Sequence, residues 1–403
     1  MTPRHGASAV YIARAIRDFG DGFIAILLPV YLTALGLSAF DVGVVATLAL
    51  LGSALLTLAI GFLGARHDHR RLLLAASALM AGTGIAYAAS SDYWVLLLVA
   101  FVGTINPSGG STSIFVPLEH AVLTGAVAPQ QRTAAFARYS LLGALAGAVG
   151  SLLAAAPDWL GAWAGVAALD AIKAMFLLYA ALGVLGGLVY RRIPVPAQPA
   201  VSAKPAAALG PSRAIVYRLA ALFSIDAFAG GFVVQSLLAL WLFERFELSL
   251  AAASPFFFLS GLLAAFSFPI AAWIGARIGL VNTMVFTHIP SSLCLIGAAF
   301  APSLEAVLTL LLVRAALSQM DVPTRSSYVM AVVTESERSA AASVTAVPRS
   351  LASAASPAIA GALFAAGLQA WPLLLCGGLK ILYDLMLLAA FRHVRPPEEC
   401  KPT

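Results

Sequence analysis

The sequence predicts an all-α polytopic membrane protein with twelve transmembrane helices in two pseudo-symmetric six-helix bundles. Of the 403 residues, 61% are hydrophobic and 10% are charged, and the mean hydropathy is +0.93. Soluble proteins are about a quarter charged, so this chain cannot cover a soluble surface. Its apolar residues also occur in blocks of roughly 20, the length that crosses a bilayer core. Finally, the second half of the chain repeats the first.

The apolar blocks form two sets of six, separated by a polar segment. The first set is 13–35, 42–64, 71–90, 93–126, 133–156 and 166–190, and the second is 215–243, 250–274, 281–300, 304–332, 339–366 and 371–392. Residues 191–213 are rich in Pro and Ala and have no apolar period, which is typical of a flexible linker. We therefore expect two domains, 1–190 and 214–403, joined by the linker 191–213.

The repeat consists of four residue pairs in the same order at nearly one offset. The pairs are Gly64 with Gly275 (275 − 64 = 211), Val116 with Val322 (322 − 116 = 206), Arg132 with Arg338 (338 − 132 = 206) and Lys173 with Lys380 (380 − 173 = 207). Each half has an even number of spans, so the two copies run parallel and are related by an axis along the membrane normal.

Charge patterning predicts the orientation of the chain. The net charge of +6 and pI of about 9.4 come from Lys and Arg in alternate loops rather than on one face, which argues against nucleic acid as a partner. The basic loops, including the linker, mark the cytoplasmic side. We expect both termini to be cytoplasmic, in a plasma membrane or in the inner membrane of a Gram-negative bacterium.

Several classes of function lack a signature. The three cysteines are scattered and indicate neither disulfides nor a metal site. No phosphate-binding loop, metal-binding His/Glu pair or nucleophile with its base occurs. We therefore expect no enzyme activity, no cofactor and no ATP-driven pumping. The first apolar run has no cleavage site after it and is interpreted as a retained helix.

The loop between the second and third spans resembles the signature loop of the major facilitator superfamily. The family pattern is Gly-x-x-x-Asp-Arg-x-Gly-Arg-Arg. Residues that match or surround it here are Gly61, Gly64, Arg66, Asp68, Arg70 and Arg71. Ala65 replaces the acidic residue that helps to latch the cytoplasmic side in the family, and Asp68 is a candidate substitute.

The resemblance covers essentially the whole chain. It implies the family's twelve-helix fold, transport of a small solute by alternating access, a monomer in the lipid bilayer, and a central cavity partly lined by the tenth span. Gly143 and Gly147 in the fifth span resemble part of the Gly-x-x-x-Gly-Pro motif of proton-coupled drug antiporters, without its proline. The alternative explanation is close helix packing through small residues.

Ionisable residues within the spans are the strongest functional pointers, because burying a charge in a membrane is costly. Three pairs have i, i+4 spacing and can neutralise one another on one helix face. They are Arg14 with Asp18, Arg17 with Asp21, and Asp321 with Arg325. For each pair the alternatives are structural pairing or gating, or contact with the substrate. Lys380 and Asp384 have the same spacing, and we expect a structural pair there.

Asp226 has no basic residue one turn away, so it is a candidate proton carrier, since apolar surroundings raise the pKa of a carboxyl group. The alternative is a salt bridge to Arg325 or Arg349. Glu119 aligns with Arg325 across the repeat and is a second proton-coupling candidate, able to pair with Arg325 in a gate. Arg349 follows Pro348 and needs an anion: Asp226, Asp321 or the substrate. His120 is interpreted as a packed hydrogen-bonding residue.

Polar residues interrupt the fourth span, and discontinuous helices are where carriers often bind substrate. Candidates that line the cavity are Asn106, Ser108, Ser111 and Gln235. A kink between packed helices is the alternative.

The predicted function is secondary active transport of a small solute, coupled to protons through Asp226 and Glu119. The predicted substrate or gate residues are Arg17, Asp21, Asp321, Arg325 and Arg349. We expect efflux of a drug-like compound or metabolite. Uptake or exchange of a small organic anion is the alternative, and a membrane sensor or lipid-handling protein without solute turnover is an alternative of another class.

Overall fold

The computed structural model describes residues 4–63, 67–109, 113–128, 131–193, 209–334, 337–392 and 394. Within these ranges it contains sixteen α-helices and no β-strand. Contacts group the chain into two units. The first comprises Met1–Ala203 and Val234–Gly261, and the second comprises Lys204–Val233 and Leu262–Thr403. Residues 234–261 thus group with the first unit, although the repeat assigns them to the second half. The domain boundaries inferred from sequence stay a prediction.

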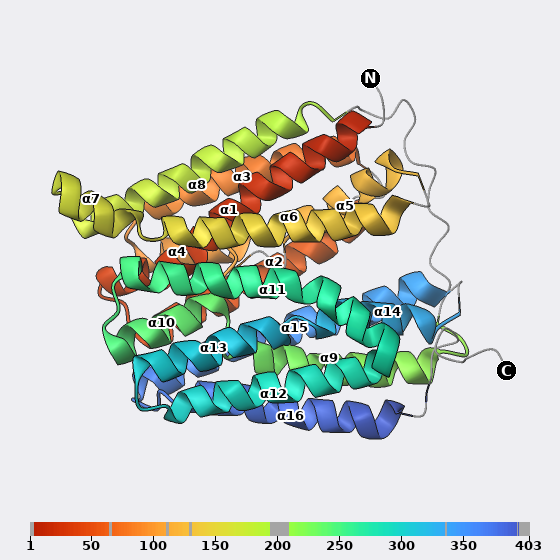
Figure 1. Cartoon of the computed structure of the whole chain (residues 1–403). Helices are drawn as coiled ribbons and strands as arrows, with labels where there is room; N and C mark the ends of the chain where they lie inside the picture. Colours follow the sequence, from red (N-terminus) through yellow and green to blue (C-terminus); the bar gives the residue numbers. More distant parts are fainter. Residues whose placement is uncertain are drawn as a thin grey trace. The chain divides into compact units, whose positions relative to one another are not determined.

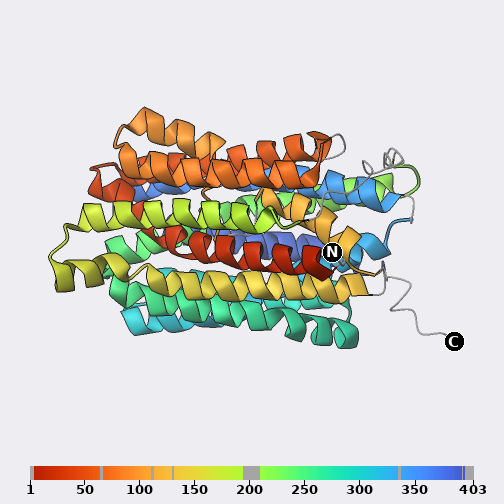
Figure 2. The same cartoon turned by 90° about the horizontal axis from the view of Figure 1, so that it is seen from above.

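The first unit is built around four long helices that run alongside one another, α1, α3, α6 and α8 (Figures 1 and 2). Its helices are α1 (Arg4–Ala34), α2 (Ala39–Leu63), α3 (His69–Ala89), α4 (Tyr93–Val102), α5 (Phe115–Ala126), α6 (Arg132–Leu153), α7 (Ala156–Ala164), α8 (Ala168–Tyr190) and α10 (Gln235–Phe246). α11 (Leu250–Ile278) begins in this unit and continues into the second.

Small residues and stacked rings hold the long helices of the first unit together. A Cβ atom at Gly22 would lie 2.1 Å from the carbonyl oxygen of Gly147, and one at Gly150 would lie 2.0 Å from that of Phe19, so α1 and α6 touch through their backbones. The rings of Tyr87 and Phe176 stack 5.1 Å apart between α3 and α8. The glycines of the fifth span therefore serve close packing.

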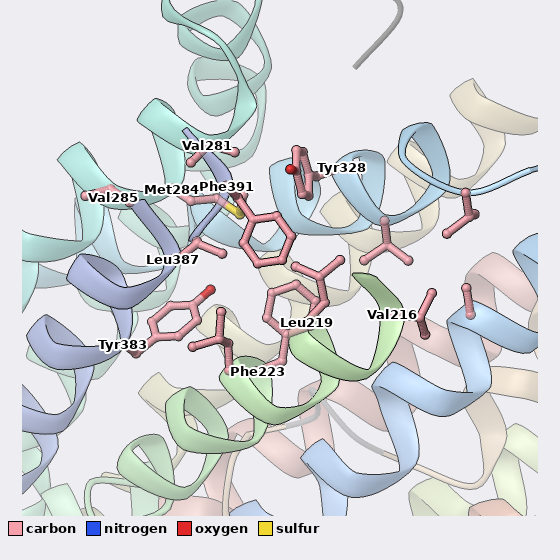
Figure 3. Packing of buried hydrophobic residues seen from close by; sticks show 14 residues of the cluster. Val216, Leu219, Phe223, Val281, Met284, Val285, Tyr328, Tyr383, Leu387 and Phe391 are labelled. Carbon is pink, nitrogen blue, oxygen red and sulfur yellow. The ribbon is translucent and has the colours of Figure 1, made fainter. Parts of the chain in front are cut away.

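The second unit packs α9 against α15 and α16, and α12 against α13 and α16. Its helices are α9 (Arg213–Gly231), α12 (Leu280–Phe300), α13 (Leu304–Ser318), α14 (Asp321–Ala331), α15 (Arg338–Ala365) and α16 (Trp371–Phe391). Figure 3 shows its core, in which Phe223 of α9 and Tyr383 of α16 meet edge to face at 6.5 Å. Phe391 of α16 and Tyr328 of α14 belong to the same cluster and meet edge to face.

Three predicted spans are each made of two helices. The fourth is α4 and α5, the seventh α9 and α10, and the tenth α13 and α14. The breaks in the fourth and tenth spans follow the predicted polar interruptions. The break after Gly231 in the seventh was not predicted, although consecutive glycines disfavour a helix interior. α5 begins at Phe115 and α14 at Asp321, an offset of 206 (321 − 115) that matches the sequence repeat.

Nine stretches of the described chain are long and apolar enough to cross a membrane. These nine agree with nine of the twelve predicted spans, and the remaining three predicted spans are α1, α4 with α5, and α15. α1 carries five charged residues within 31 residues, so its composition is less apolar although its length of about 46 Å suffices. The chain is a multi-pass membrane protein, and the count of twelve spans stays a prediction.

Hydrogen bonds to the carboxylate of Glu337 join the segment before α9 to the start of α15. Glu337 accepts hydrogen bonds from the backbone N–H of Gly210 at 2.5 Å and from the hydroxyls of Ser212 and Thr334 at 2.7 and 2.6 Å. These bonds favour the ionised carboxylate and lower the pKa of Glu337 to about 2. The end of the predicted linker is thus anchored within the second unit.

Candidate functional site

Each unit contains a buried network of charged residues, and the network of the second unit centres on Asp226. This residue of α9 is 4% exposed. Its Oδ2 accepts from Arg325 of α14 at 3.1 Å, and its Oδ1 accepts from the ammonium group of Lys380 of α16 at 2.6 Å. The structure therefore shows the alternative predicted for Asp226, a salt bridge to Arg325, together with a second cation that the sequence analysis did not assign to it.

The arginine of this network is shared between two carboxylates. Arg325 also donates to Asp321 at 2.9 Å, which is the predicted i, i+4 pair at the start of α14. Asp321 lies in the first turn of that helix, where the partial positive charge of the helix N-terminus favours a carboxylate. Proline at position 323 is compatible with this first turn. Arg325 thus links α14 to α9.

Arg349 differs from Arg325 and Lys380, the two cations that contact Asp226. Among the described residues it forms no ion pair, and its buried Nε has no hydrogen-bond partner. Its electrostatic neighbours are Arg325, Asp226 and Asp321. The predicted need for an anion is therefore not met by a direct carboxylate contact in the part of the chain that the structure describes.

Lys380 and Asp384 were expected to pair with each other, and the structure pairs them with other helices instead. Lys380 binds Asp226, whereas Asp384, which is fully buried, faces His288 of α12. Nδ1 of His288 lies 3.1 and 3.0 Å from the two carboxylate oxygens of Asp384. Partners on neighbouring helices are closer than the partner one turn away, so spacing along one helix gave the wrong pair.

The network of the first unit centres on Glu119 of α5, which is fully buried. Its Oε1 lies 3.0 Å from Nη1 of Arg17 and accepts from the hydroxyl of Tyr190, and its Oε2 accepts from the hydroxyl of Tyr139 at 2.5 Å. Three helices besides α5 thus supply its partners: α1, α6 and α8. In this conformation Glu119 and Arg325 each have partners in their own unit, not the mutual pairing that the repeat allowed.

The two predicted pairs of α1 have different outcomes. Arg14 and Asp18 pair at 2.7 Å as predicted. Arg17 turns instead toward Glu119 and Asp18, the latter at 3.4 Å, so the predicted pair with Asp21 is wrong. Asp21 receives a hydrogen bond from Tyr179 at 3.2 Å and has no cation partner within the described ranges.

Sequence reasoning missed the tyrosine and histidine partners of the buried carboxylates. Tyr139, Tyr179 and Tyr190 satisfy the carboxylates of the first unit, and His288 does so in the second. Each lies in an apolar span, and a buried polar ring group needs a partner. That signal identifies such residues as candidates, but it names no partner. His120 packs edge to face against the rings of Phe136 and Tyr139, which agrees with its predicted packing, and the predicted hydrogen bond of its ring stays a prediction.

The interrupted fourth span forms a tight polar loop within the first unit. The side chain of Asn106 accepts from the N–H of Ser108 at 2.9 Å, and Gly109 has φ of +68°. A Cβ atom at Gly109 would lie 2.2 Å from the side-chain oxygen of Gln235, so this residue of α10 packs directly on the loop. Three of the four predicted cavity residues thus lie together, and Ser111 lies outside the described residues.

The predicted cytoplasmic loop is described in part. Asp68 caps α3 by accepting from the N–H of Arg70 at 3.0 Å, a local role that the sequence analysis did not assign to it. Gly61 has open space around its Cα, and Arg71 is exposed. Gly64 and Arg66 lie outside the described residues. No group of three or more potential metal ligands occurs in the described ranges.

One described hollow is lined by none of the charged residues of the two networks. It is an open groove of about 450 Å³ on the first unit, and all of its lining residues are apolar. They are Ala15, Ile16, Phe19, Leu142, Leu145, Ala146, Val149 and Leu182. A lining without polar groups cannot orient a polar solute, so the charged networks remain the candidate site.

Known proteins similar to this chain are transporters or membrane proteins. The family model of the Major Facilitator Superfamily matches residues 10–320. An uncharacterized membrane protein of Saccharomyces cerevisiae is 21% identical over 413 aligned positions, which cover 94% of this chain and 92% of the yeast chain.

Solved structures give the same result at lower identity. A bacterial homologue of the iron transporter ferroportin, in an inward-facing state, has a TM-score of 0.74 at 14% identity, covering 96% of this chain and 99% of that one. The nucleoside transporter NupG has a TM-score of 0.72 at 14% identity, with the same coverage of 96% and 99%. Such likeness shows a shared fold.

Proposed function

The chain belongs to the Major Facilitator Superfamily, and from this premise we propose that it is a proton-coupled secondary transporter of a small organic solute that carries an anionic group. Membership of the family makes it a membrane transporter rather than an enzyme. The proposed cycle is alternating access, in which ion pairs within the spans rearrange as the site opens to each side.

One observation carries the proposed substrate charge: among the described residues Arg349 has no carboxylate in direct contact, while its neighbours Arg325 and Lys380 do. Arg325 contacts two carboxylates and Lys380 contacts one. A guanidinium group in a membrane needs an anion, and its planar donors match a carboxylate or phosphate group. An anionic group of the substrate fits this place, where it would supply Arg349 with a direct partner.

Efflux of a drug-like compound remains a second prediction, but with less support than before. Its sequence argument was the partial glycine motif, and Gly147 and Gly150 are accounted for by the backbone contact of α1 with α6. The ferroportin homologue and the nucleoside transporter carry dissimilar substrates according to their names, so likeness of fold selects no substrate. The proposal therefore concerns the charge of the solute rather than its direction of transport.

Proton coupling is proposed for Asp226 and Glu119, the two predicted carriers, with a condition set by their contacts. In this conformation Asp226 is ion-paired to Lys380 and Arg325, and Glu119 is ion-paired to Arg17. A carboxylate that faces a cation holds a proton poorly. Uptake of a proton therefore requires the cation to move away, which ties protonation to the conformational step.

The test is solute flux in proteoliposomes that contain a pH-sensitive dye. A panel of organic mono- and dianions, their neutral esters and cationic drugs is added to wild type, Arg349→Gln and Arg277→Gln. The last is the matched control, since Arg277 is exposed and lies over Trp273. We expect flux with anions only. In Arg349→Gln we expect a 10- to 100-fold lower apparent affinity for the anion, because a hydrogen bond to a charged group contributes about 1.5–3 kcal/mol. Flux with neutral or cationic drugs, unchanged in Arg349→Gln, would contradict the anion proposal.

A further inference from the structure

His288 is a buried titratable residue to which the proposed transport cycle assigns no role. It lies in the middle of α12 and is 2% exposed. Its two ring nitrogens face different groups. Nδ1 faces the carboxylate of Asp384, and Nε2 lies 3.2 Å from Nζ of Lys380 and 3.8 Å from Oδ1 of Asp226. The ring of Tyr383, a member of the apolar core, packs edge to face against it at 6.1 Å.

These partners assign the protonation state of the ring in this conformation. A lysine ammonium group donates hydrogen bonds and accepts none. For Lys380 to donate to Nε2, that nitrogen must carry its lone pair, so the proton of a neutral His288 is on Nδ1 and is donated to Asp384. Lys380 then donates both to Nε2 and to Asp226 Oδ1, which lies 2.6 Å from its Nζ.

A proton on Nε2 is incompatible with this arrangement. It would remove the lone pair that Lys380 uses and bring a second positive charge to within 3.2 Å of the ammonium group. The new N–H would face Asp226 Oδ1, which is 3.8 Å away, and could donate to it after a small movement. Protonated His288 and Lys380 therefore compete for the same carboxylate oxygen.

We infer that His288 is a proton-binding site of the second unit, at which proton uptake exchanges Lys380 for His288 as the partner of Asp226. The inference rests on the proposed proton-coupled transport and adds His288 to Asp226 and Glu119 as a proton-binding residue. Uptake of the proton forms an N–H bond at Nε2, and the ammonium of Lys380 keeps its own protons. The ion pair that joins α9 to α16 is thereby replaced by an ion pair that joins α9 to α12.

Charge balance around His288 agrees with proton-linked binding of an anion. The charged groups in or beside this network, all on helices other than α12, are Asp226 of α9, Arg314 of α13, Asp321 and Arg325 of α14, Arg349 of α15, and Lys380 and Asp384 of α16. Arg314 has Cys294 and Cys376 as its electrostatic neighbours, which leaves three carboxylates and three cations in the network itself. A proton on His288 leaves one excess positive charge there. Proton binding and anion binding then favour each other, as linkage requires.

The experiment reads the state of the imidazole directly and needs no substrate. The chain has six histidines. Protein labelled with ¹⁵N-histidine is studied in lipid nanodiscs by NMR between pH 5 and 9. The signal absent from His288→Gln is that of His288, and His120→Gln serves as the assignment control from the first unit. We expect the Nδ1–H tautomer at high pH and the doubly protonated ring at low pH.

Lys380 supplies the test of competition. In Lys380→Met the ammonium group is absent, so His288 should become protonated at a pH at least one unit higher than in wild type. Lys380→Arg retains a cation and should leave the midpoint within half a unit of wild type. The Nε2–H tautomer at high pH in wild type, or the same midpoint in Lys380→Met, would overturn the inference. If Lys380→Met does not fold, the tautomer of wild type decides.

Failure of the inference and failure of the proposed function give different results. A His288 that stays neutral throughout, alongside anion-evoked proton flux in the vesicles, removes only His288 as a proton-binding residue. A titrating His288 in a protein that transports no anion of the panel contradicts the proposed function and leaves the proton site in place.

Discussion

At Glu119 one carboxylate collects partners from α1, α6 and α8, so this single side chain joins four elements of the first unit. Neutralising one member of a buried ion pair leaves the other member as an unpaired buried charge. This destabilises the fold more than replacing both members by apolar residues would. The same reasoning applies to Asp226, which two cations contact.

This cost gives a residue-scale prediction for the first unit. Glu119→Gln leaves Arg17 with only its longer contact to Asp18 at 3.4 Å and should lower the free energy of unfolding by about 3–5 kcal/mol. The double variant Arg17→Met with Glu119→Gln should recover part of that loss, because the buried guanidinium group that lost its nearest partner is then absent as well. Thermal unfolding in detergent measures both. A double variant less stable than the single one would show that the residues stabilise the fold in some way other than as a pair.

Spacing along one helix predicted half of the local ion pairs. Arg14 with Asp18 and Asp321 with Arg325 form as predicted. Arg17 and Lys380 instead reach carboxylates on other helices. Long side chains can reach either kind of partner, and tertiary packing decides which carboxylate is nearest. Tyrosine and histidine partners of the carboxylates carry no charge pattern in the sequence, which explains why they were missed.

At the scale of the element, small residues decide where helices meet. Gly22 of α1 faces the backbone of α6 so closely that any side chain must push the two helices apart. Gly82 of α3 has open space where its Cβ atom would be. Both glycines lie inside helices, where alanine is intrinsically the better helix former.

Gly22→Ala should therefore be destabilising, whereas Gly82→Ala should be neutral or slightly stabilising. Overpacking at Gly22 should reduce the free energy of unfolding by about 1–3 kcal/mol, and the gain in helix propensity at Gly82 amounts to at most about 1 kcal/mol. Tryptophan fluorescence during heating measures both variants in one assay. Equal unfolding temperatures would mean that α1 and α6 are less closely packed than described here.

Two of the broken spans, the fourth and the tenth, follow the sequence repeat in the position of their second helix. α5 and α14 begin 206 residues apart, the offset found in the sequence for Val116 with Val322. Each carries the acidic or basic residue on which its unit's network depends, Glu119 or Arg325. The two helices thus start at equivalent positions of the repeat, whereas the charge at the next equivalent position is negative in α5 (Glu119) and positive in α14 (Arg325).

At the scale of the whole molecule, the arrangement of the chain in the membrane follows from the placement of Lys and Arg in alternate loops. The predicted orientation puts the linker 191–213 in the cytoplasm and Glu305, which is exposed at the start of α13, on the opposite side. Residues 194–208 of the linker lie outside the described residues, and its sidedness depends on sequence alone.

Labelling of introduced cysteines tests this orientation. In a Cys400→Ser background, Ser202→Cys should react with a membrane-impermeant maleimide only after cells are opened, because the linker is predicted to face the cytoplasm. Glu305→Cys should react in intact cells, and it is the control for access from outside. The reverse pattern would invert the predicted topology of every span.

The sequence by itself determined the class of the protein: blocks of about twenty apolar residues in a chain that is 10% charged can satisfy their backbone only as helices in a membrane. It also determined the family, the repeat and which charges lie within the spans. Only the tertiary structure decided the partner of each charge, the break after Gly231 and the place of His288 between Asp384 and Lys380. The reason is physical: hydrophobic burial is read along the chain, whereas the partner of a buried charge depends on which side chains from distant segments pack within a few ångströms.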